Sequence, residues 1–258
     1  MLLAFDIGNT TIAIGLFRGR KLVKSWKIKT DSDKTSDEYG AILLNLMQVG
    51  GLAPGKVTGA IVSSVVPPLT PVIEEMCLAY FSMTASVVGP GLKTGMPILY
   101  ESPLEVGADR ITAAVAAFEK YGGPLIVLDF GTATTFDAVS AKGEYLGGAI
   151  APGIRISAEA LYLKTAKLPR IEIRKPKRAI GRTTVSSMQS GLYFGYIGLV
   201  TNTIREIRKE LGGSARVIAT GGFGGQVVPE LAEIEAYEPD LVLEGLRIIH
   251  ERNRDARG

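Results

Sequence analysis

Cysteine and histidine are nearly missing from this sequence of 258 residues, which holds one of each, Cys77 and His250. A single thiol excludes an internal disulfide framework, and the apolar helical pattern around Cys77 favours a buried structural thiol over a nucleophile. His250 falls late in an amphipathic segment, where an imidazole would stabilise the C-terminal end of a helix. We therefore expect neither residue to carry catalysis.

Long apolar runs are also missing. No run approaches the roughly 18 residues that a helix needs to cross a bilayer. The chain enters a strand-like pattern directly after Met1, without the basic segment and cleavage site of a secretory signal. We expect a cytoplasmic protein that makes no membrane contact.

Two common nucleotide-binding signatures do not occur in the sequence. There is no Gly-x-x-x-x-Gly-Lys-Ser/Thr segment, which excludes a Walker-type phosphate loop. The glycine turns that follow Asp6 and Asp129 lack Gly-x-Gly-x-x-Gly, which excludes a Rossmann dehydrogenase.

Charge is modest, with a formal net charge of +3 and 21% charged residues. The densest basic stretch covers residues 170–182, and no aromatic residues interleave it. We interpret this stretch as a solvated loop, with a surface that faces phosphates as the alternative, and we expect no nucleic-acid partner. The apolar fraction of 46% is ordinary for a globular protein.

Strand-like and helical patterns alternate along the chain, which predicts an α/β protein. Strands are expected at 2–6, 11–17, 21–29, 59–65, 86–88, 125–129, 133–140, 144–151 and 215–220. Helices are expected at 38–49, 69–81, 106–121, 153–163, 185–211 and 240–252.

The pattern restarts about half-way along the chain, which indicates an internal repeat. An apolar strand ending in Asp6-Ile7-Gly8-Asn9-Thr10 corresponds to one ending in Asp129-Phe130-Gly131-Thr132, and the hairpin glycines Gly19 and Gly143 follow at similar spacing. The repeat predicts two duplicated domains, 1–118 and 119–258. Each should contain a mixed sheet of three antiparallel strands followed by helix–strand units.

The two repeated turns have a chemical use. Glycine lets a phosphate approach the backbone amides, and the Asn and Thr side chains add donors. An aspartate at the strand end suits a hydrated Mg²⁺ or another cation. One such turn is usually only a hairpin, but two copies that faced each other would hold a polyphosphate from both sides.

This arrangement resembles the superfamily of actin, hexokinase and the heat-shock ATPases, whose two ribonuclease-H-like lobes clamp ATP. That superfamily also places an adenosine-contacting glycine pair after a late strand, and Gly221-Gly222 fits this position. An ordinary strand-to-helix turn is the alternative interpretation of the pair.

A phosphoryl transferase needs a group that positions or deprotonates the accepting hydroxyl. In the segment Gly107-Ala108-Asp109-Arg110, the helix N-terminus would attract an anion and Arg110 offers a planar donor fork. Asp109 could accept the hydroxyl proton. The alternative is that Asp109 only stabilises the helix dipole.

The motifs together, in order and spacing, resemble type III pantothenate kinase over the whole chain. They are Asp6-Ile7-Gly8-Asn9-Thr10, Gly107-Ala108-Asp109-Arg110, the run 129–137, Gly147-Gly148-Ala149-Ile150-Ala151-Pro152-Gly153, Thr220-Gly221-Gly222 and the stretch 239–246. The resemblance implies ATP-dependent phosphorylation of pantothenate to 4′-phosphopantothenate, the first step of coenzyme A synthesis. It also implies Mg²⁺ and a monovalent cation, K⁺ or NH₄⁺, as cofactors.

The resemblance assigns roles to individual residues. The first phosphate turn would be Asp6, Gly8, Asn9, Thr10 and Thr11, with Asp6 near Mg²⁺, and the second would be Gly131 and Thr132. Asp129 would hold the monovalent cation, Gly221 and Gly222 would contact adenosine, and Asp109 would be the catalytic base. Pantothenate would contact Tyr100, Gly107, Ala108, Asp109, Arg110 and Thr184.

The family is typically homodimeric, with the substrate site built across the interface. The stretch 190–200 is apolar around most of a helix and contains three glycines, which suits close helix contact, although an internal core helix would look the same. Two other functions stay open: a transcriptional accessory protein of the same family, and a kinase for another small alcohol on the same scaffold.

Overall fold

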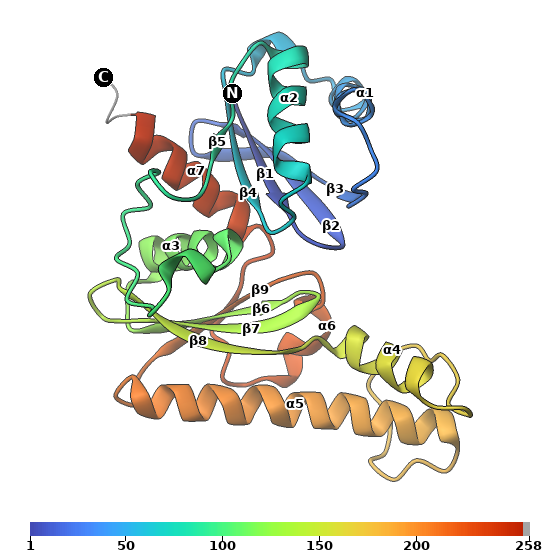
Figure 1. Ribbon diagram of the computed structural model, residues 1–258. Coiled ribbons are helices and arrows are strands. Elements are labelled where there is room, and N and C mark those ends of the chain that lie inside the picture. The colour runs from blue at the N-terminus through green and yellow to red at the C-terminus, as the bar shows by residue number, and fades with distance from the viewer. Residues whose placement is uncertain (255–258) are drawn as a thin grey trace. The chain divides into compact units, whose positions relative to one another are not determined.

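The computed structural model describes residues 1–254 and divides into two compact units (Figure 1). The first unit contains Met1–Lys120 and the described chain from Asp240 onward, and the second contains Tyr121–Pro239. The domain boundary expected from the sequence put the last helix with the second domain, whereas the structure groups it with the first unit.

That last helix, α7 (Leu241–Arg254), packs on strands of the first sheet. Two close approaches explain its position. A Cβ on Gly245 would lie 2.0 Å from the carbonyl oxygen of Thr112 in helix α3 (Ala108–Tyr121), and a Cβ on Gly15 would lie 3.2 Å from Leu243. Glycine at these two positions lets α7 approach both the sheet and α3.

The first sheet has the strand order β3-β2-β1-β4-β5. Its strands are β1 (Leu2–Ile7), β2 (Thr11–Arg18), β3 (Lys21–Lys29), β4 (Gly59–Ser64) and β5 (Ser86–Val87). The first three are antiparallel, and β4 and β5 continue the sheet in parallel. Two further helices, α1 (Ser36–Val49) and α2 (Leu69–Phe81), belong to this unit.

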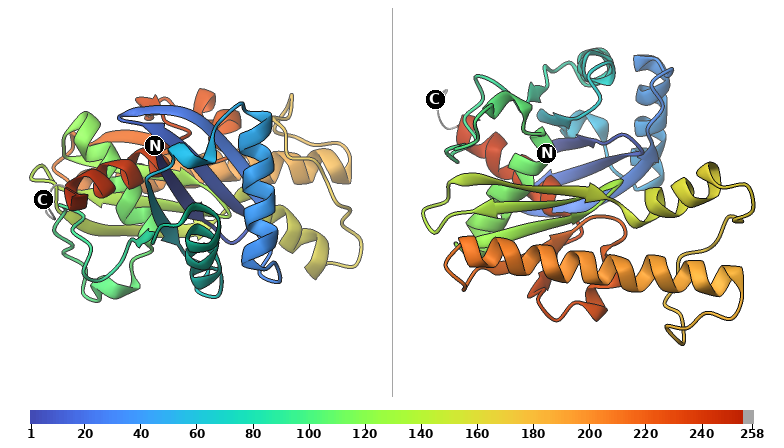
Figure 2. Two further views of the ribbon diagram at one scale, coloured as in Figure 1. Left: turned by 90° about the horizontal axis from the view of Figure 1, so that it is seen from above. Right: turned by 60° about the horizontal axis from the view of Figure 1, so that its bottom comes forward.

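The second sheet has the order β10-β9-β6-β7-β8. Its strands are β6 (Leu125–Phe130), β7 (Ala133–Val139), β8 (Tyr145–Pro152), β9 (Arg216–Thr220) and β10 (Ala236–Tyr237), and its helices are α4 (Ile154–Lys164), α5 (Thr184–Glu210) and α6 (Gly224–Val227). Figure 2 shows α5 lying along one face of this sheet, while its N-terminal part, α4 and the loop 165–183 extend beyond the sheet. We call these extending segments the arm.

Both sheets have the same strand arrangement when the first is read from β3 and the second from β8. In each, three antiparallel strands are followed by two parallel ones. The register also shifts at corresponding places, between Leu16 and Phe17 in β2 and between Ala138 and Val139 in β7. A shared bulge is strong evidence for duplication because bulges are specific local features. The predicted fold of two duplicated α/β units is therefore confirmed.

Side chains along β1 alternate between the apolar core and the opposite face, which carries Asp6. Phe5 and Ile7 point into an apolar core formed with α1 and α2, so Asp6 points to the opposite face. Cys77 lies in the same core, where burial raises the pKa of its thiol to about 12. The expectation of a buried structural thiol is confirmed.

The expected strands and helices all occur, with ends that differ by up to two residues. The sequence analysis missed β10, α6 and three short 3₁₀ helices at Pro54–Lys56, Pro103–Glu105 and Val228–Glu230. These elements have two to four residues, too few to show a period in the sequence. Within residues 1–254, no helix is long and apolar enough to cross a membrane.

Candidate active site

The first predicted phosphate turn joins β1 to β2 in the first unit. The Gly8 amide donates to the carbonyl oxygen of Thr11 at 3.1 Å, and the Asn9 and Thr10 side chains are exposed. Thr30, just after β3, makes two hydrogen bonds to the turn. Its hydroxyl donates to the Gly8 carbonyl at 2.6 Å and its amide donates to the Thr10 carbonyl at 3.1 Å. The structure therefore adds Thr30 as a support that the sequence analysis missed.

The second predicted turn joins β6 to β7 in the second unit. Gly131 donates to the Ala133 carbonyl at 3.1 Å, as Gly8 does in the first turn. Gly153, which precedes α4, donates to the Thr132 carbonyl at 3.2 Å, and a Cβ on it would lie 2.3 Å from that oxygen. The N-terminus of α4 thus lies against the turn, and its positive end favours an anion there.

Asp129 and the glycine pair meet at the end of β6. Gly221 has φ of +93°, and a Cβ on it would lie 2.2 Å from the Asp129 carboxylate oxygen. The Phe223 amide donates to the Phe130 carbonyl at 3.1 Å, and the Tyr237 hydroxyl donates to the Gly221 carbonyl at 2.8 Å. Asp129, the second turn and the glycine pair therefore form one cluster within the second unit.

Tyr196 of α5 supports this cluster from the core side of the sheet. Its hydroxyl lies 2.6 Å from the hydroxyl of Thr134, and its ring centroid lies 6.2 Å from that of Phe130. Burial raises the pKa of Tyr196 to about 12, and the negative charge of Asp129 adds to the increase. The phenol is therefore neutral at physiological pH and acts as a hydrogen-bonding support.

Asp137 lies on β7, two residues beyond Thr135, which is the register partner of Asp129. Its side chain is buried and accepts hydrogen bonds from the Tyr145 hydroxyl at 2.6 Å and the Thr135 hydroxyl at 3.1 Å. These bonds satisfy a buried carboxylate within the sheet. Asp137 therefore has a structural role within the second sheet.

Asp109 lies at the N-terminus of α3, which begins at Ala108. The Arg110 amide donates to the Asp109 carboxylate at 2.8 Å. Burial raises the pKa of Asp109 above its ordinary value, and the amide and charge of Arg110 offset part of the increase. The side chain is thus a carboxylate with increased proton affinity, as a general base requires.

Contacts within the first unit place Asp109 near the end of β1. The Val65 amide donates to the Ile7 carbonyl at 3.0 Å, and a Cβ on Gly107 would lie 3.6 Å from Val65 Cγ1. The segment Gly107–Arg110 and the end of the strand that carries Asp6 are therefore neighbours.

Tyr100 and Thr184, the other residues predicted to contact pantothenate, lie in different units. Tyr100 is half-buried in the irregular segment that precedes the 3₁₀ turn Pro103–Glu105 and then Gly107. Thr184 is exposed in the first turn of α5, after the capping box of Thr183 and Ser186. Thr184 is the first residue of α5, in the part of that helix that extends beyond the sheet.

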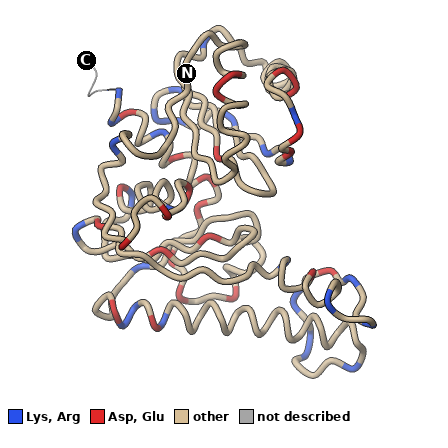
Figure 3. Tube along the Cα trace, viewed as in Figure 1, with Lys and Arg blue, Asp and Glu red and all other residues tan. Residues whose placement is uncertain are grey.

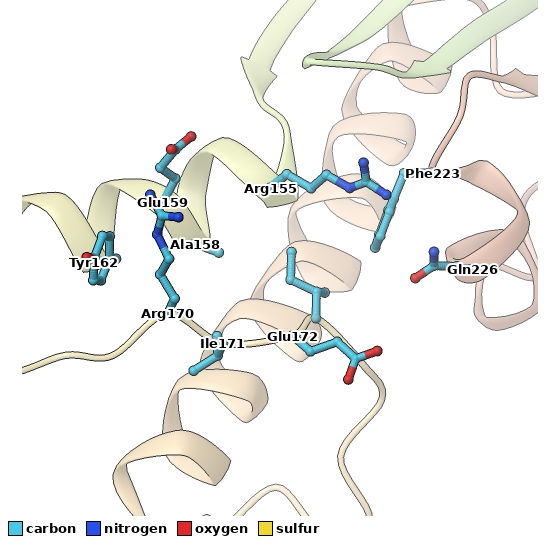
Figure 4. A pocket seen from close by; sticks show the side chains of 10 residues that line it. Arg155, Ala158, Glu159, Tyr162, Arg170, Ile171, Glu172, Phe223 and Gln226 are labelled. Atoms are coloured by element: carbon cyan, nitrogen blue, oxygen red, sulfur yellow. The ribbon is translucent and has the colours of Figure 1, made fainter. Parts of the chain in front are cut away.

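A cavity of about 410 Å³ opens in the second unit beside the glycine pair (Figure 4). Its lining comes from α4, from residues 170–173 and from the segment that follows Gly222. The guanidinium carbon of Arg155 lies 5.7 Å from the Phe223 ring centroid, and that of Arg170 lies 4.7 Å from the Tyr162 ring centroid. Stacked guanidinium and aromatic faces suit a planar, electron-rich ligand.

Lysine and arginine are frequent on the arm (Figure 3). Most of the stretch 170–182 is exposed, as the interpretation of a solvated loop requires. Its first residues, however, line the cavity. The alternative interpretation, a surface that faces phosphates, stays a prediction.

Within residues 1–254, no group of three His, Cys, Asp or Glu side chains could hold a metal ion without other ligands. A single carboxylate combined with phosphate oxygens and waters is the usual environment of Mg²⁺ at a nucleotide. The strand-end aspartates Asp6 and Asp129 fit that mode of binding.

Solved structures of low sequence identity share this fold. An inorganic polyphosphate/ATP-glucomannokinase from Arthrobacter sp. strain KM matches with a TM-score of 0.50 and 14% identity, over 97% of this chain and 98% of that one. A candidate Baf family transcriptional activator from Campylobacter jejuni matches with a TM-score of 0.64 and 18% identity, over 98% and 99%. The fold of two duplicated α/β sheets is thus shared with these solved structures.

Sequence comparison identifies the family. Residues 2–206 match the model of type III pantothenate kinase. The type III pantothenate kinase of Geobacter sulfurreducens is 54% identical over 99% of this chain and its own whole length, and that of Moorella thermoacetica is 53% identical over 98% and its whole length. The chain belongs to the type III pantothenate kinase family, as the motifs predict.

Proposed function

We propose that this enzyme transfers the γ-phosphoryl group of ATP to the terminal hydroxyl of pantothenate, yielding 4′-phosphopantothenate and ADP, the first step of coenzyme A synthesis. The observation that carries the proposal is the half-buried Asp109 carboxylate at the start of α3, beside the end of the strand that bears Asp6. Family membership over residues 2–206 supports the same reaction.

Asp109 acts as the base in this proposal. The pantothenate hydroxyl oxygen forms a bond to the γ-phosphorus while the bond from that phosphorus to the ADP oxygen breaks, and the hydroxyl proton passes to the Asp109 carboxylate. Arg110 offers a planar donor fork for the pantothenate carboxylate. Gly107, Ala108, Tyr100 and Thr184 contribute the remaining substrate contacts.

ATP uses groups of both units. Gly8, Asn9, Thr10 and Thr11 bind phosphate oxygens in one turn, and Gly131 and Thr132 bind them in the other. Gly221 and Gly222 lie against the adenosine, and the 410 Å³ cavity next to them accepts the base, with the Phe223 ring and the Arg155 guanidinium as stacking surfaces.

Two cations accompany the nucleotide. Mg²⁺, which neutralises the charge of the phosphates, binds near Asp6, since one carboxylate beside a phosphate turn suits its preference for oxygen ligands. K⁺ or NH₄⁺ binds at Asp129, where a carboxylate beside a second phosphate turn concentrates negative charge.

The active form is a homodimer that forms through α5, and its substrate site includes Thr184 at the interface. Phe194 and Leu199 are exposed apolar residues of α5, and Cβ atoms built on Gly191, Gly195 and Gly198 would meet nothing within 4 Å. These five residues form an exposed stripe on one face of the helix, which suits close contact with a second copy. We place this enzyme in the cytoplasm, where ATP is available for coenzyme A synthesis.

ADP release, measured with a coupled assay for pantothenate, glycerol, hexoses and acetate, tests the function. We expect release that depends on pantothenate and on Mg²⁺, and that requires K⁺ or NH₄⁺ rather than Na⁺. Equal rates with another alcohol, or no pantothenate-dependent release, would overturn the proposed substrate. Full activity in buffer with only Na⁺ would remove the monovalent cation from Asp129.

A further inference from the structure

Ser63 is the register partner of Asp6 on the neighbouring parallel strand β4. Register partners point to the same face of a sheet, so both side chains lie on the face opposite the apolar core of α1 and α2. Val62, the residue before Ser63, points into that core, which agrees with this orientation. Ser63 therefore lies beside the proposed magnesium aspartate.

The Ser63 hydroxyl is fully buried and has no hydrogen-bond partner within residues 1–254. A buried hydroxyl without a partner destabilises the folded state, and unpaired buried polar groups are rare in folded proteins. An alanine here would avoid this cost without changing the backbone. Without a ligand, the Ser63 hydroxyl therefore lowers the stability of the folded state.

The second unit repeats the same pair. Asp129 on β6 is in register with Thr220 on the parallel strand β9, and Thr220 is also buried. Both strand-end aspartates are thus accompanied by a hydroxyl residue at the equivalent position of the neighbouring strand. A pairing that occurs in both copies points to a role connected with the aspartates.

The neighbouring Ser64 provides a contrast. Its hydroxyl accepts from the Val66 amide and donates to the Val66 carbonyl, both at 3.2 Å, which closes the turn after β4. Ser64 therefore has a structural role with its hydrogen bonds already made. Ser63 has the same chemistry on the opposite face, without such bonds.

We propose that Ser63 is a positioning residue for the magnesium–nucleotide complex, which rests on the proposed ATP site at Asp6. When the complex binds, the Ser63 hydroxyl donates a hydrogen bond to the Asp6 carboxylate and fixes the carboxylate toward the hydrated metal. The buried hydroxyl of Ser63 thus gains a hydrogen-bond partner only when the complex is bound. Ser63 touches neither the transferred phosphoryl group nor pantothenate.

Binding of Mn²⁺, a paramagnetic substitute for Mg²⁺, tests the proposal by electron paramagnetic resonance titration of the full chain in the presence of ADP. Hydrogen bonds to charged groups contribute about 1.5–3 kcal/mol, so Ser63→Ala should weaken Mn²⁺ binding by about tenfold or more. The melting temperature should be unchanged or higher, because an unpaired buried hydroxyl is removed. Ser63→Thr, which keeps the hydroxyl, should retain more of the affinity.

Ser64→Ala is the matched control, since it removes the same group one residue away. It should lower the melting temperature and leave Mn²⁺ affinity near that of the wild type. Equal Mn²⁺ affinity of Ser63→Ala and the wild type would overturn the proposal, as would equal losses in both alanine variants.

A kinetic measurement separates this inference from the proposed function. In the kinase assay, Ser63→Ala should raise the Mg²⁺ concentration needed for half-maximal rate and change kcat at saturating Mg²⁺ much less. A wild-type enzyme without pantothenate kinase activity, but with Mn²⁺–ADP binding that depends on Ser63, would overturn the function and retain the inference. An active wild type with a Ser63→Ala variant of unchanged Mn²⁺ affinity would do the reverse.

Discussion

The Asp109 carboxylate occupies the space that a side chain at residue 107 would need. A Cβ on Gly107 would lie 2.5 Å from Asp109 Oδ1, closer than real Cβ contacts allow. Glycine at position 107 therefore determines where the proposed base can lie. This relationship, together with the pKa of Asp109, allows the proposed chemistry to be tested by small substitutions.

Gly107→Ala should displace the Asp109 carboxylate while the rest of the helix stays intact, because residue 107 precedes α3. Displacement of the base should slow mainly the chemical step. We therefore expect kcat to fall by about tenfold or more, equivalent to roughly 1.4 kcal/mol of transition-state stabilisation. Steady-state kinetics with pantothenate measure it, and a far-ultraviolet dichroism spectrum controls for folding. A variant with wild-type kcat would show that the contact does not position the base.

Asp109→Asn should abolish most turnover, by about 10²- to 10⁴-fold if Asp109 is the general base. The same variant should be more stable than the wild type at neutral pH. Burial raises the pKa of Asp109, so the stability linked to its protonated form is present below the unfolded-state pKa and lost as pH rises through the folded-state pKa.

Melting temperatures of the Asp109→Asn variant and of the wild type, taken at a series of pH values, measure this difference in stability. The difference should favour the variant at neutral pH and shrink as the pH falls toward 3.8, the ordinary pKa of an aspartate. Equal stability at every pH would contradict the burial of a charged carboxylate. Normal turnover would remove Asp109 from the mechanism.

The pH dependence of kcat/KM should show an acid limb governed by Asp109 in the free enzyme. Because burial is the largest effect on this carboxyl, the limb should have an apparent pKa above 3.8. Rates fall as pH decreases through that value, since the protonated base cannot accept the hydroxyl proton. Initial rates over a series of overlapping buffers at constant ionic strength provide the measurement, and a flat profile down to 3.8 would contradict the assignment.

The glycine pair allows a comparison of neighbouring positions. Gly221→Ala places a side chain at φ of +93° and against the Asp129 carboxylate, which should cost about 2 kcal/mol or more and weaken activation by K⁺. Gly222→Ala is the comparison for thermal stability without nucleotide, since a Cβ there would meet no described atom within 4 Å. Thermal melts and K⁺ titrations of both variants decide the matter. Equal behaviour would show that the contact with Asp129 has no effect.

Phe194→Glu should convert the proposed dimer to a monomer, because a charge on the exposed stripe of α5 would be buried without a partner. Light scattering after size exclusion should give about twice 27.4 kDa for the wild type and a single chain for the variant. Val49→Glu, at another exposed apolar position in the other unit, should leave the mass unchanged. A dimeric Phe194→Glu variant would rule out this interface.

The sequence predicts elements well where the pattern is local. Alternation and flanking turns place β3, and the double proline before Leu69 places the start of α2. The repeated Asp-x-Gly turns also predict the duplication, because the two copies keep the residues that the turns require. The sequence does not indicate the contacts that α7 makes at Gly15 and Gly245, since they join segments far apart in the chain.

The supports of the candidate site could not be read from the sequence for the same reason. Thr30 holds a turn 22 residues earlier, and Tyr196 reaches Thr134 from 62 residues away. Each has the local context of an ordinary strand end or core helix. Ser63 looks like one of two adjacent serines until strand register places it beside Asp6.

The single cysteine has a practical consequence for spectroscopy. A thiol buried in the core of α1 and α2, with a pKa of about 12, stays protonated and shielded from maleimide reagents at neutral pH. The natural chain is therefore already a cysteine-silent background for fluorescent labelling. A pair of cysteines introduced at exposed positions, one in each unit, would report the distance between the two units in solution as nucleotide and pantothenate are added.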